Sequence, residues 1–213
     1  KIGLVYDKRA EWNEAFRYLN SALEELKREP DPIEEARVYN AIGMIHFRRG
    51  DYSEAIEMIS KALELAEGTD SYDVLSNSYR YLGNCHLLLG QVDKAREFYQ
   101  KGLEIAQKLD DVIQLSSYYN NLGAVYRRSG ELDKAIEYYL KSYQEKEKIG
   151  YADGMIVSLQ NIAMIYCDKG DLKGAEGYIE QAMRIAERIG AQKRIADIYN
   201  SLGTSAFYNG RYK

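Results

Sequence analysis

Few residues in this chain could take part in catalysis or bind a metal. Its only histidines, His46 and His86, lie 40 residues apart, and its only cysteines are Cys85 and Cys167. A zinc site needs three or four ligands, and no acidic or cysteine pair recurs in step with the two histidines. We therefore interpret the histidines as packing residues and the cysteines as small apolar side chains.

Motifs for nucleotide binding or covalent chemistry are also missing from the sequence. It contains no Gly-rich phosphate loop, nucleophile elbow or HExxH helix, and Gly170, Gly174 and Gly177 do not form a dinucleotide fingerprint. Asp and Glu are plentiful, but they fall mostly at expected helix ends and outer faces, where they are solvated. The sequence predicts a protein that is not an enzyme and uses no metal or other cofactor.

The overall charge limits the choice of partner. The 213 residues carry a formal net charge of −4, whereas affinity for phosphates rests mainly on net and clustered positive charge. No window approaches the roughly 18 uninterrupted apolar residues of a membrane-spanning helix. We expect neither nucleic-acid nor membrane binding. Two cysteines and no Asn-X-Ser/Thr sequon predict a reducing, cytoplasmic compartment.

An internal repeat organises the chain and must position any functional side chain. Glycine recurs every 40 residues from Gly50 to Gly210, and a series of alanines from Ala15 to Ala175 keeps the same step. A period of this length is typical of repeat architectures. The predicted units are residues 31–70, 71–110, 111–150 and 151–190, with a truncated unit at 1–30 and the first helix of another at 191–213.

Each unit is predicted to form a hairpin of two helices. In residues 31–50 the apolar residues recur at helical spacing. Asp31 followed by Pro32 and Glu34 is a signal for a helix start, and Gly50 favours the left-handed conformation that ends a helix. A second cap signal, Asp51 with Glu54, then starts the second helix.

Neighbouring hairpins are expected to stack. One hairpin cannot bury both faces of its first helix, so each unit must pack on the next. Small residues, such as Gly43 and Ala55, let the two helices of a hairpin approach closely. No strand pattern and no Gly/Ser linker interrupts the units. We therefore expect residues 1–213 to form one array.

These hairpins resemble the tetratricopeptide repeat over essentially the whole chain. In that family an aromatic, a large apolar residue, a glycine and a second aromatic mark the first helix, a glycine marks the turn, and two alanines with an aromatic mark the second helix. The matching residues are Tyr39, Ile42, Gly43, His46, Gly50, Ala55, Ile59 and Ala62; Tyr79, Leu82, Gly83, His86, Gly90, Ala95, Tyr99 and Gly102; Tyr119, Leu122, Gly123, Tyr126, Gly130, Ala135, Tyr139 and Ser142; and Leu159, Ile162, Ala163, Tyr166, Gly170, Ala175, Ile179 and Ala182.

The match departs from the family pattern in two ways. The repeat has 40 residues instead of about 34, and the family's proline near the end of the second helix is missing. In its length the repeat resembles those of Pins/LGN-type polarity scaffolds and of prokaryotic signalling proteins. The resemblance implies an all-α, right-handed superhelical solenoid whose first helices line a concave groove for a segment of another protein.

The family's groove positions carry mainly amides and arginines here. An amide both donates and accepts hydrogen bonds, so a row of amides can pair with the backbone of an extended peptide. Arginine pairs with carboxylates through two hydrogen bonds. The groove positions hold five arginines and only two aspartates, so their net charge is positive. We expect an acidic partner. The expected contacts are Arg37, Asn40, Arg48, Asn77, Arg80, Asn84, Asn120, Asn121, Arg127, Arg128, Gln160, Asn161 and Asn200.

Other interpretations compete with this groove. The repeats could be an intramolecular regulatory or sensor module of a signalling protein, packed on an effector domain that this sequence lacks. The two-carboxylate clamp that binds chaperone tails in some family members fits Arg80, Asn84 and Asn121, but Val157 and Asn161 occupy its last two positions. Helical-repeat RNA binding would instead favour a period near 35 residues and a basic pI.

The two ends of the sequence suggest a longer protein. The chain begins at Lys1, without a methionine, and stops just after the first helix of a unit. Tyr199 and Leu202 would then lack a packing partner on one side. Because terminal repeats need polar caps, we expect further chain, another molecule or a second copy to cover this end.

Overall fold

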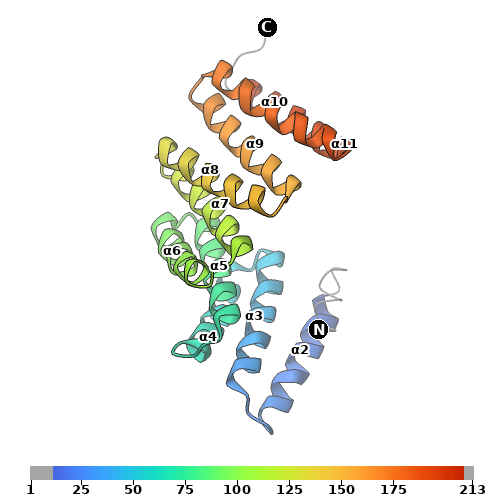
Figure 1. Cartoon of the computed structure of the whole chain (residues 1–213). Coiled ribbons are helices and arrows are strands. Elements are labelled where there is room, and N and C mark those ends of the chain that lie inside the picture. The colour runs from blue at the N-terminus through green and yellow to red at the C-terminus, as the bar shows by residue number, and fades with distance from the viewer. Residues whose placement is uncertain (1–11, 209–213) are drawn as a thin grey trace. The chain divides into compact units, whose positions relative to one another are not determined.

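The computed structural model describes the backbone of residues 12–208 and the side chains of residues 12–200 (Figure 1). Throughout residues 12–208 the chain forms helices and no strand. Gly210 and the side chain of Leu202, which the sequence analysis uses, lie outside these described parts. The helices are α2 (Trp12–Leu26), α3 (Pro32–Arg49), α4 (Tyr52–Ala66), α5 (Tyr72–Leu88), α6 (Val92–Lys108), α7 (Val112–Arg128), α8 (Leu132–Lys148), α9 (Ala152–Asp168), α10 (Leu172–Arg188) and α11 (Gln192–Tyr208).

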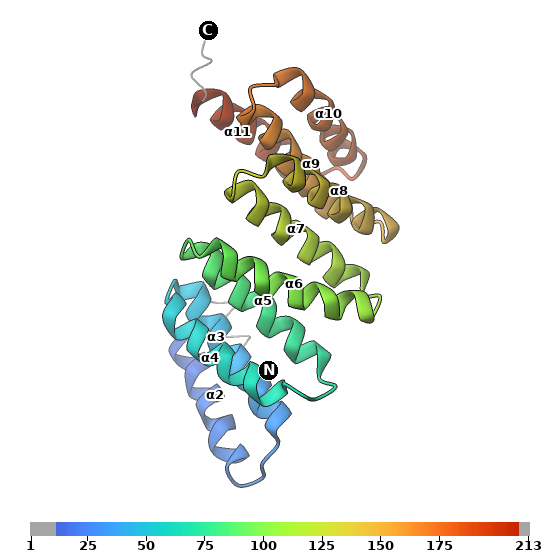
Figure 2. The same cartoon turned by 90° about the vertical axis from the view of Figure 1, so that its left-hand side faces the viewer.

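Three of the predicted hairpins appear as pairs of adjacent helices. Helix α3 lies beside α4, α7 beside α8, and α9 beside α10, which are the first and second helices of successive repeats (Figure 2). The chain divides into two compact units, residues 1–105 and residues 106–213. That the whole chain forms one array stays a prediction.

The helix ends follow the sequence signals with one exception. The Asp31 carboxylate accepts hydrogen bonds from the backbone N–H groups of Ile33 and Glu34, at 3.0 and 3.1 Å. Gly50, with φ of 87°, ends α3 in the left-handed region that suits glycine. The expected capping by Asp51 is wrong in its detail, because its side chain makes no cap hydrogen bond. The carboxylate of Asp51 pairs with Arg49 at 3.0 Å instead.

The stacking of neighbouring repeats can be followed within each unit. In the first unit, Ala62 and Ala66 of α4 belong to one buried cluster with Val74 and Leu75 of α5. In the second, a cluster of residues from α9, α10 and α11 includes Ile156, Ala186 and Ile198. Buried apolar side chains therefore join one repeat to the next within each unit.

The histidines and cysteines are packing residues, as predicted. His86 is 7% exposed and stacks on Phe98 with ring centroids 5.2 Å apart, and its Nδ1 lies 2.6 Å from Gln91 Oε1. His46 lies 4.9 Å from the Phe16 ring. Both cysteines are buried and unbridged.

None of the helices between Trp12 and Tyr208 combines the length and the apolar character needed to cross a membrane.

Tyr199, on α11, is 62% exposed, and the covering of this residue by further chain or by another molecule remains a prediction.

Candidate protein-binding surface

The predicted contact residues lie on the first helices of the repeats. We call the side chains at these positions the first-helix surface, and we describe it separately for each compact unit. In the first unit they lie on α3 and α5, and in the second on α7, α9 and α11. The residues on α3 and α5 are Arg37, Asn40, Arg48, Asn77, Arg80 and Asn84, and those on α7, α9 and α11 are Asn120, Asn121, Arg127, Arg128, Gln160, Asn161 and Asn200.

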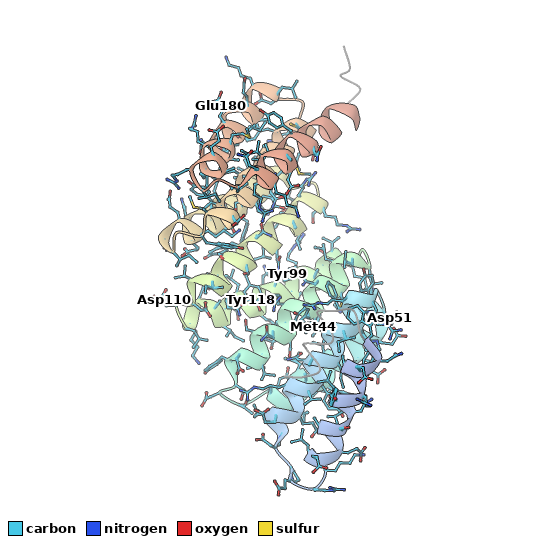
Figure 3. All side chains as sticks on the ribbon, turned by 90° about the vertical axis from the view of Figure 1, so that its right-hand side faces the viewer. Met44, Asp51, Tyr99, Asp110, Tyr118 and Glu180 are labelled. Carbon is cyan, nitrogen blue, oxygen red and sulfur yellow. The ribbon has the colours of Figure 1, made fainter. Side chains whose placement is uncertain are left out.

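A pocket lies between α3 and α5 in the first unit. Its volume is about 250 Å³. Figure 3 shows one of its lining residues, Met44, on α3. The first helices of two neighbouring repeats line the pocket. The family resemblance implies a groove along these first helices. Its lining residues are Arg37, Asn40, Ala41, Met44, Asp73, Val74, Asn77 and Tyr81.

The Asn40 amide joins α3 to α5. Asn40 is 9% exposed. Its Nδ2 lies 3.0 Å from the hydroxyl of Ser78 and 3.4 Å from the carbonyl oxygen of Val74, and the same hydroxyl lies 3.1 Å from its Oδ1. A buried amide must find hydrogen bonds inside the protein. Asn40, which the sequence predicts to contact a partner, therefore links the first helices of two neighbouring repeats by hydrogen bonds.

Arg37 is held by two carboxylates. Its guanidinium pairs with Glu34 on the same helix and with Asp73 on α5, whose Oδ2 lies 3.0 Å from the arginine Nη2. The hydrogen bond that Arg37 donates to Glu34, followed by the one that it donates to Asp73, raises the pKa of Arg37 above its usual value. Its positive charge is therefore balanced by neighbours in the same unit.

The polar residues of α5 also bond to one another. Asn77 donates to the carbonyl oxygen of Asp73 at 2.9 Å and accepts from Arg80 at 2.8 Å. The Arg80 guanidinium lies 4.5 Å from the centre of the Tyr81 ring, which is a cation–π distance. Asn84 accepts a hydrogen bond of 2.6 Å from the Tyr99 hydroxyl.

Polar pairs join the first helices of the second unit in the same way. Arg127 of α7 donates to Asp168 of α9 at 2.8 and 3.2 Å. Asn161 Nδ2 donates to Asn120 Oδ1 at 3.2 Å. Arg194 of α11 pairs with Asp153 of α9 at 2.7 Å. Each pair connects one repeat to the next.

These pairs change the charge expected for the first-helix surface. Asp73 and Asp153 are not at the family's groove positions, although acidic residues 36 or 41 positions from an arginine are a signal that could have indicated them. Two arginines differ from Arg37 and Arg127, since no carboxylate of the described residues pairs with Arg80 or Arg128. Arg128 is exposed, whereas Asn121 and Gln160 are half-buried. Arg48 and Asn200 are exposed as well.

Comparisons with known proteins give the family. A sequence model of the tetratricopeptide repeat matches residues 1–68 and 73–148, and a second tetratricopeptide-repeat model matches residues 156–189. No curated protein sequence matches the chain.

Several solved structures share the fold. BtubC (BKLC) from P. vanneervenii has a TM-score of 0.81 and 22% identity, over 89% of this chain and 78% of BtubC. MamA has a TM-score of 0.67 and 24% identity, over 89% of this chain and 97% of MamA. The Rap conjugation gene regulator of the plasmid pLS20, in complex with the Phr* peptide, has a TM-score of 0.71 and 15% identity, over 97% of this chain and 60% of the regulator. Since the matching family models cover most of the sequence, the chain belongs to the tetratricopeptide-repeat family.

Proposed function

We propose that this chain is a protein-interaction scaffold, not an enzyme, and that its first-helix surface binds a segment of another protein. The observation that carries the proposal is the pocket between α3 and α5, which opens at positions where two neighbouring repeats meet. A similar fold holds a peptide in the pLS20 regulator, which supports a peptide as the kind of ligand. A concave site with apolar walls and a few polar groups is the usual form of a binding site.

We further propose that Arg80, in the first unit, and Arg128, in the second, each form a separate contact with acidic residues of a partner. A guanidinium that no carboxylate of its own protein neutralises can gain a charge-assisted pair with a ligand. Arg37 and Arg127 contribute less, because each already pairs with an aspartate. In this proposal the acid preference depends on two of the five arginines that the sequence indicates.

Charge reversal tests this proposal. We would select binders from a displayed library of random 15-residue peptides and measure the dissociation constants of the selected peptides by fluorescence polarisation. We expect these peptides to be rich in Asp and Glu, and we expect Arg80→Glu or Arg128→Glu to weaken their binding about fivefold or more at low salt.

The matched controls are Lys94→Glu and Lys173→Glu, which reverse exposed charges on the second helices α6 and α10. We expect both controls to bind the selected peptides as the parent protein does. The proposal fails if no peptide is enriched, or if binding of the enriched peptides is the same in the Arg80→Glu and Arg128→Glu variants as in the parent.

We also propose that the protein works in a reducing, cytoplasmic compartment. Cys85 and Cys167 are both buried and neither forms a disulfide, and burial raises the pKa of the Cys85 thiol to about 11. A thiol in this state is poorly reactive, and free thiols are the usual state of cysteine in such compartments.

A further inference from the structure

The walls of the α3–α5 pocket are largely apolar. Ala41 and Met44 contribute from α3, and Val74 and Tyr81 contribute from α5. Because one water molecule takes up about 30 Å³ of liquid, a pocket of about 250 Å³ has room for a whole side chain. An apolar side chain that enters it would leave water for contact with these four residues, which is the main source of binding energy in such sites.

The polar residues that line the pocket are already bonded within the protein. Arg37 pairs with Asp73 and with Glu34. The Asn40 amide bonds to Ser78, and Asn77 bonds to the Asp73 carbonyl and to Arg80. A polar ligand group would have to break one of these bonds before it could form its own, so the net gain from polar contacts is small.

We propose that this pocket selects a large uncharged apolar side chain, that of leucine, methionine or phenylalanine, in the bound segment. The inference rests on the proposed function, and it adds an anchor residue to the acidic residues proposed for Arg80. A buried apolar anchor in a pocket, surrounded by polar contacts, is a common arrangement of binding hot spots.

The charged residues at the pocket disfavour both acidic and basic side chains of a ligand. An acidic side chain would meet Asp73 in the lining, beside the Arg37 cation that Asp73 and Glu34 already neutralise. A basic side chain would have to displace Arg37 from Asp73, which it contacts through both Nε and Nη2 at 3.3 and 3.0 Å. An uncharged side chain leaves this pair intact.

The methionine methyl groups provide a direct test. We would label the full chain with [¹³C-methyl]methionine and titrate it with three probes, the N-acetyl amides of leucine, aspartic acid and arginine. We expect the leucine probe to shift the Met44 methyl signal in a saturable way, with a dissociation constant on the order of millimolar. Met164 is the matched control, because it holds the same position on α9 that Met44 holds on α3.

Two variants locate the response. Ala41→Leu reduces the volume of the pocket and keeps the Met44 reporter, and we expect it to weaken the binding of the leucine probe about tenfold. The second variant, Met44→Gln, lacks the methionine reporter, so binding is followed by the shifts of the Tyr81 ring signals, with N-acetyl-phenylalanine amide as the probe. We expect this probe to shift the Tyr81 signals in the parent and not in the variant. Unchanged methyl signals of Met58, Met155 and Met183 report that each variant is folded.

Three results would overturn the inference: an equal response of Met164, a stronger response to the aspartic acid or arginine probe, or unchanged binding in the folded Ala41→Leu variant. The test is separate from that of the proposed function. Selected peptides that depend on Arg80 but contain no large apolar residue would remove the anchor and leave the scaffold proposal intact. If the Met44 signal responds in a saturable way but no peptide is enriched in the selection, the scaffold proposal fails and the preference of the pocket for an apolar side chain stands.

Discussion

Gly83→Ala is expected to lower the free energy of unfolding by about 2–3 kcal/mol, although alanine is normally the better helix former. Gly83 lies in α5, and a Cβ atom at this position would overlap the ring of Tyr99 on α6. That ring is 1% exposed, and its hydroxyl donates to Asn84 at 2.6 Å. The ring cannot move away without losing buried contacts or this hydrogen bond, so overpacking outweighs the gain in helix propensity.

The control for this prediction is Gly177→Ala, on α10. Gly177 is also inside a helix, but an added Cβ would meet no atom within 4 Å. We expect this variant to be more stable than the parent by about 0.5–1 kcal/mol. Urea denaturation followed by circular dichroism measures both changes. Changes of the same sign in the two variants would show that close helix contact at Gly83 does not control stability.

The sequence predicted the hairpins well because their signals are local. The expected first helix in residues 31–50 agrees with α3, from Pro32 to Arg49, since its cap, its apolar spacing and its terminal glycine all lie within one repeat. The glycines inside the first helices α3, α5 and α7 were also predictable, because each one faces a large side chain 16 residues later, as Gly123 faces Tyr139 at 2.8 Å from an added Cβ.

The use of the polar side chains was harder to predict. Whether Asn40 can bind a peptide depends on Ser78, which is 38 residues away, and the charge of Arg37 depends on Asp73, which is 36 residues away. The family pattern identifies the positions that face a groove. It does not say which of their hydrogen bonds are already used between neighbouring repeats, because that requires the register of one first helix against the next.

Lys146 is a second feature that the repeat pattern did not indicate. It lies near the end of α8 and is 6% exposed. The other full repeats have a buried alanine at this position, namely Ala66, Ala106 and Ala186. The Lys146 amine donates to the hydroxyl of Ser158 on α9 at 3.0 Å, and Gly154 leaves room for the side chain, since a Cβ there would lie 2.9 Å from Lys146 Cδ.

Burial makes this amine a weaker base. It lowers the pKa of Lys146 from the usual 10.5 to about 8, and within residues 12–200 no carboxylate pairs with the amine. Between these two pH values the unfolded chain binds more protons than the folded chain does, so stability rises with pH in this range. Below about pH 8 both states are protonated, and the full penalty of a buried charge remains.

Lys146→Met is therefore expected to stabilise the protein by about 2 kcal/mol at pH 7, somewhat less than the roughly 3 kcal/mol that the full pKa shift represents, because the variant loses the hydrogen bond that the amine donates to Ser158. Methionine fills a similar volume without the charge, and Ser158 keeps its contact with the Gly154 carbonyl oxygen at 3.3 Å.

Urea denaturation of the parent and the variant at pH 7, 8, 9 and 10 measures this difference, and subtraction cancels the titration of the tyrosines that both proteins contain. The advantage of the variant should shrink as the pH rises from 8 to 10. Lys148→Met is the control on the same helix, because the hydrogen bond that Lys148 donates to Glu145 raises the pKa of Lys148, and the Lys148 side chain is 62% exposed. We expect that control to change stability by less than about 0.5 kcal/mol. A Lys146→Met advantage that is the same at all four pH values would mean that folding does not lower the pKa of this amine.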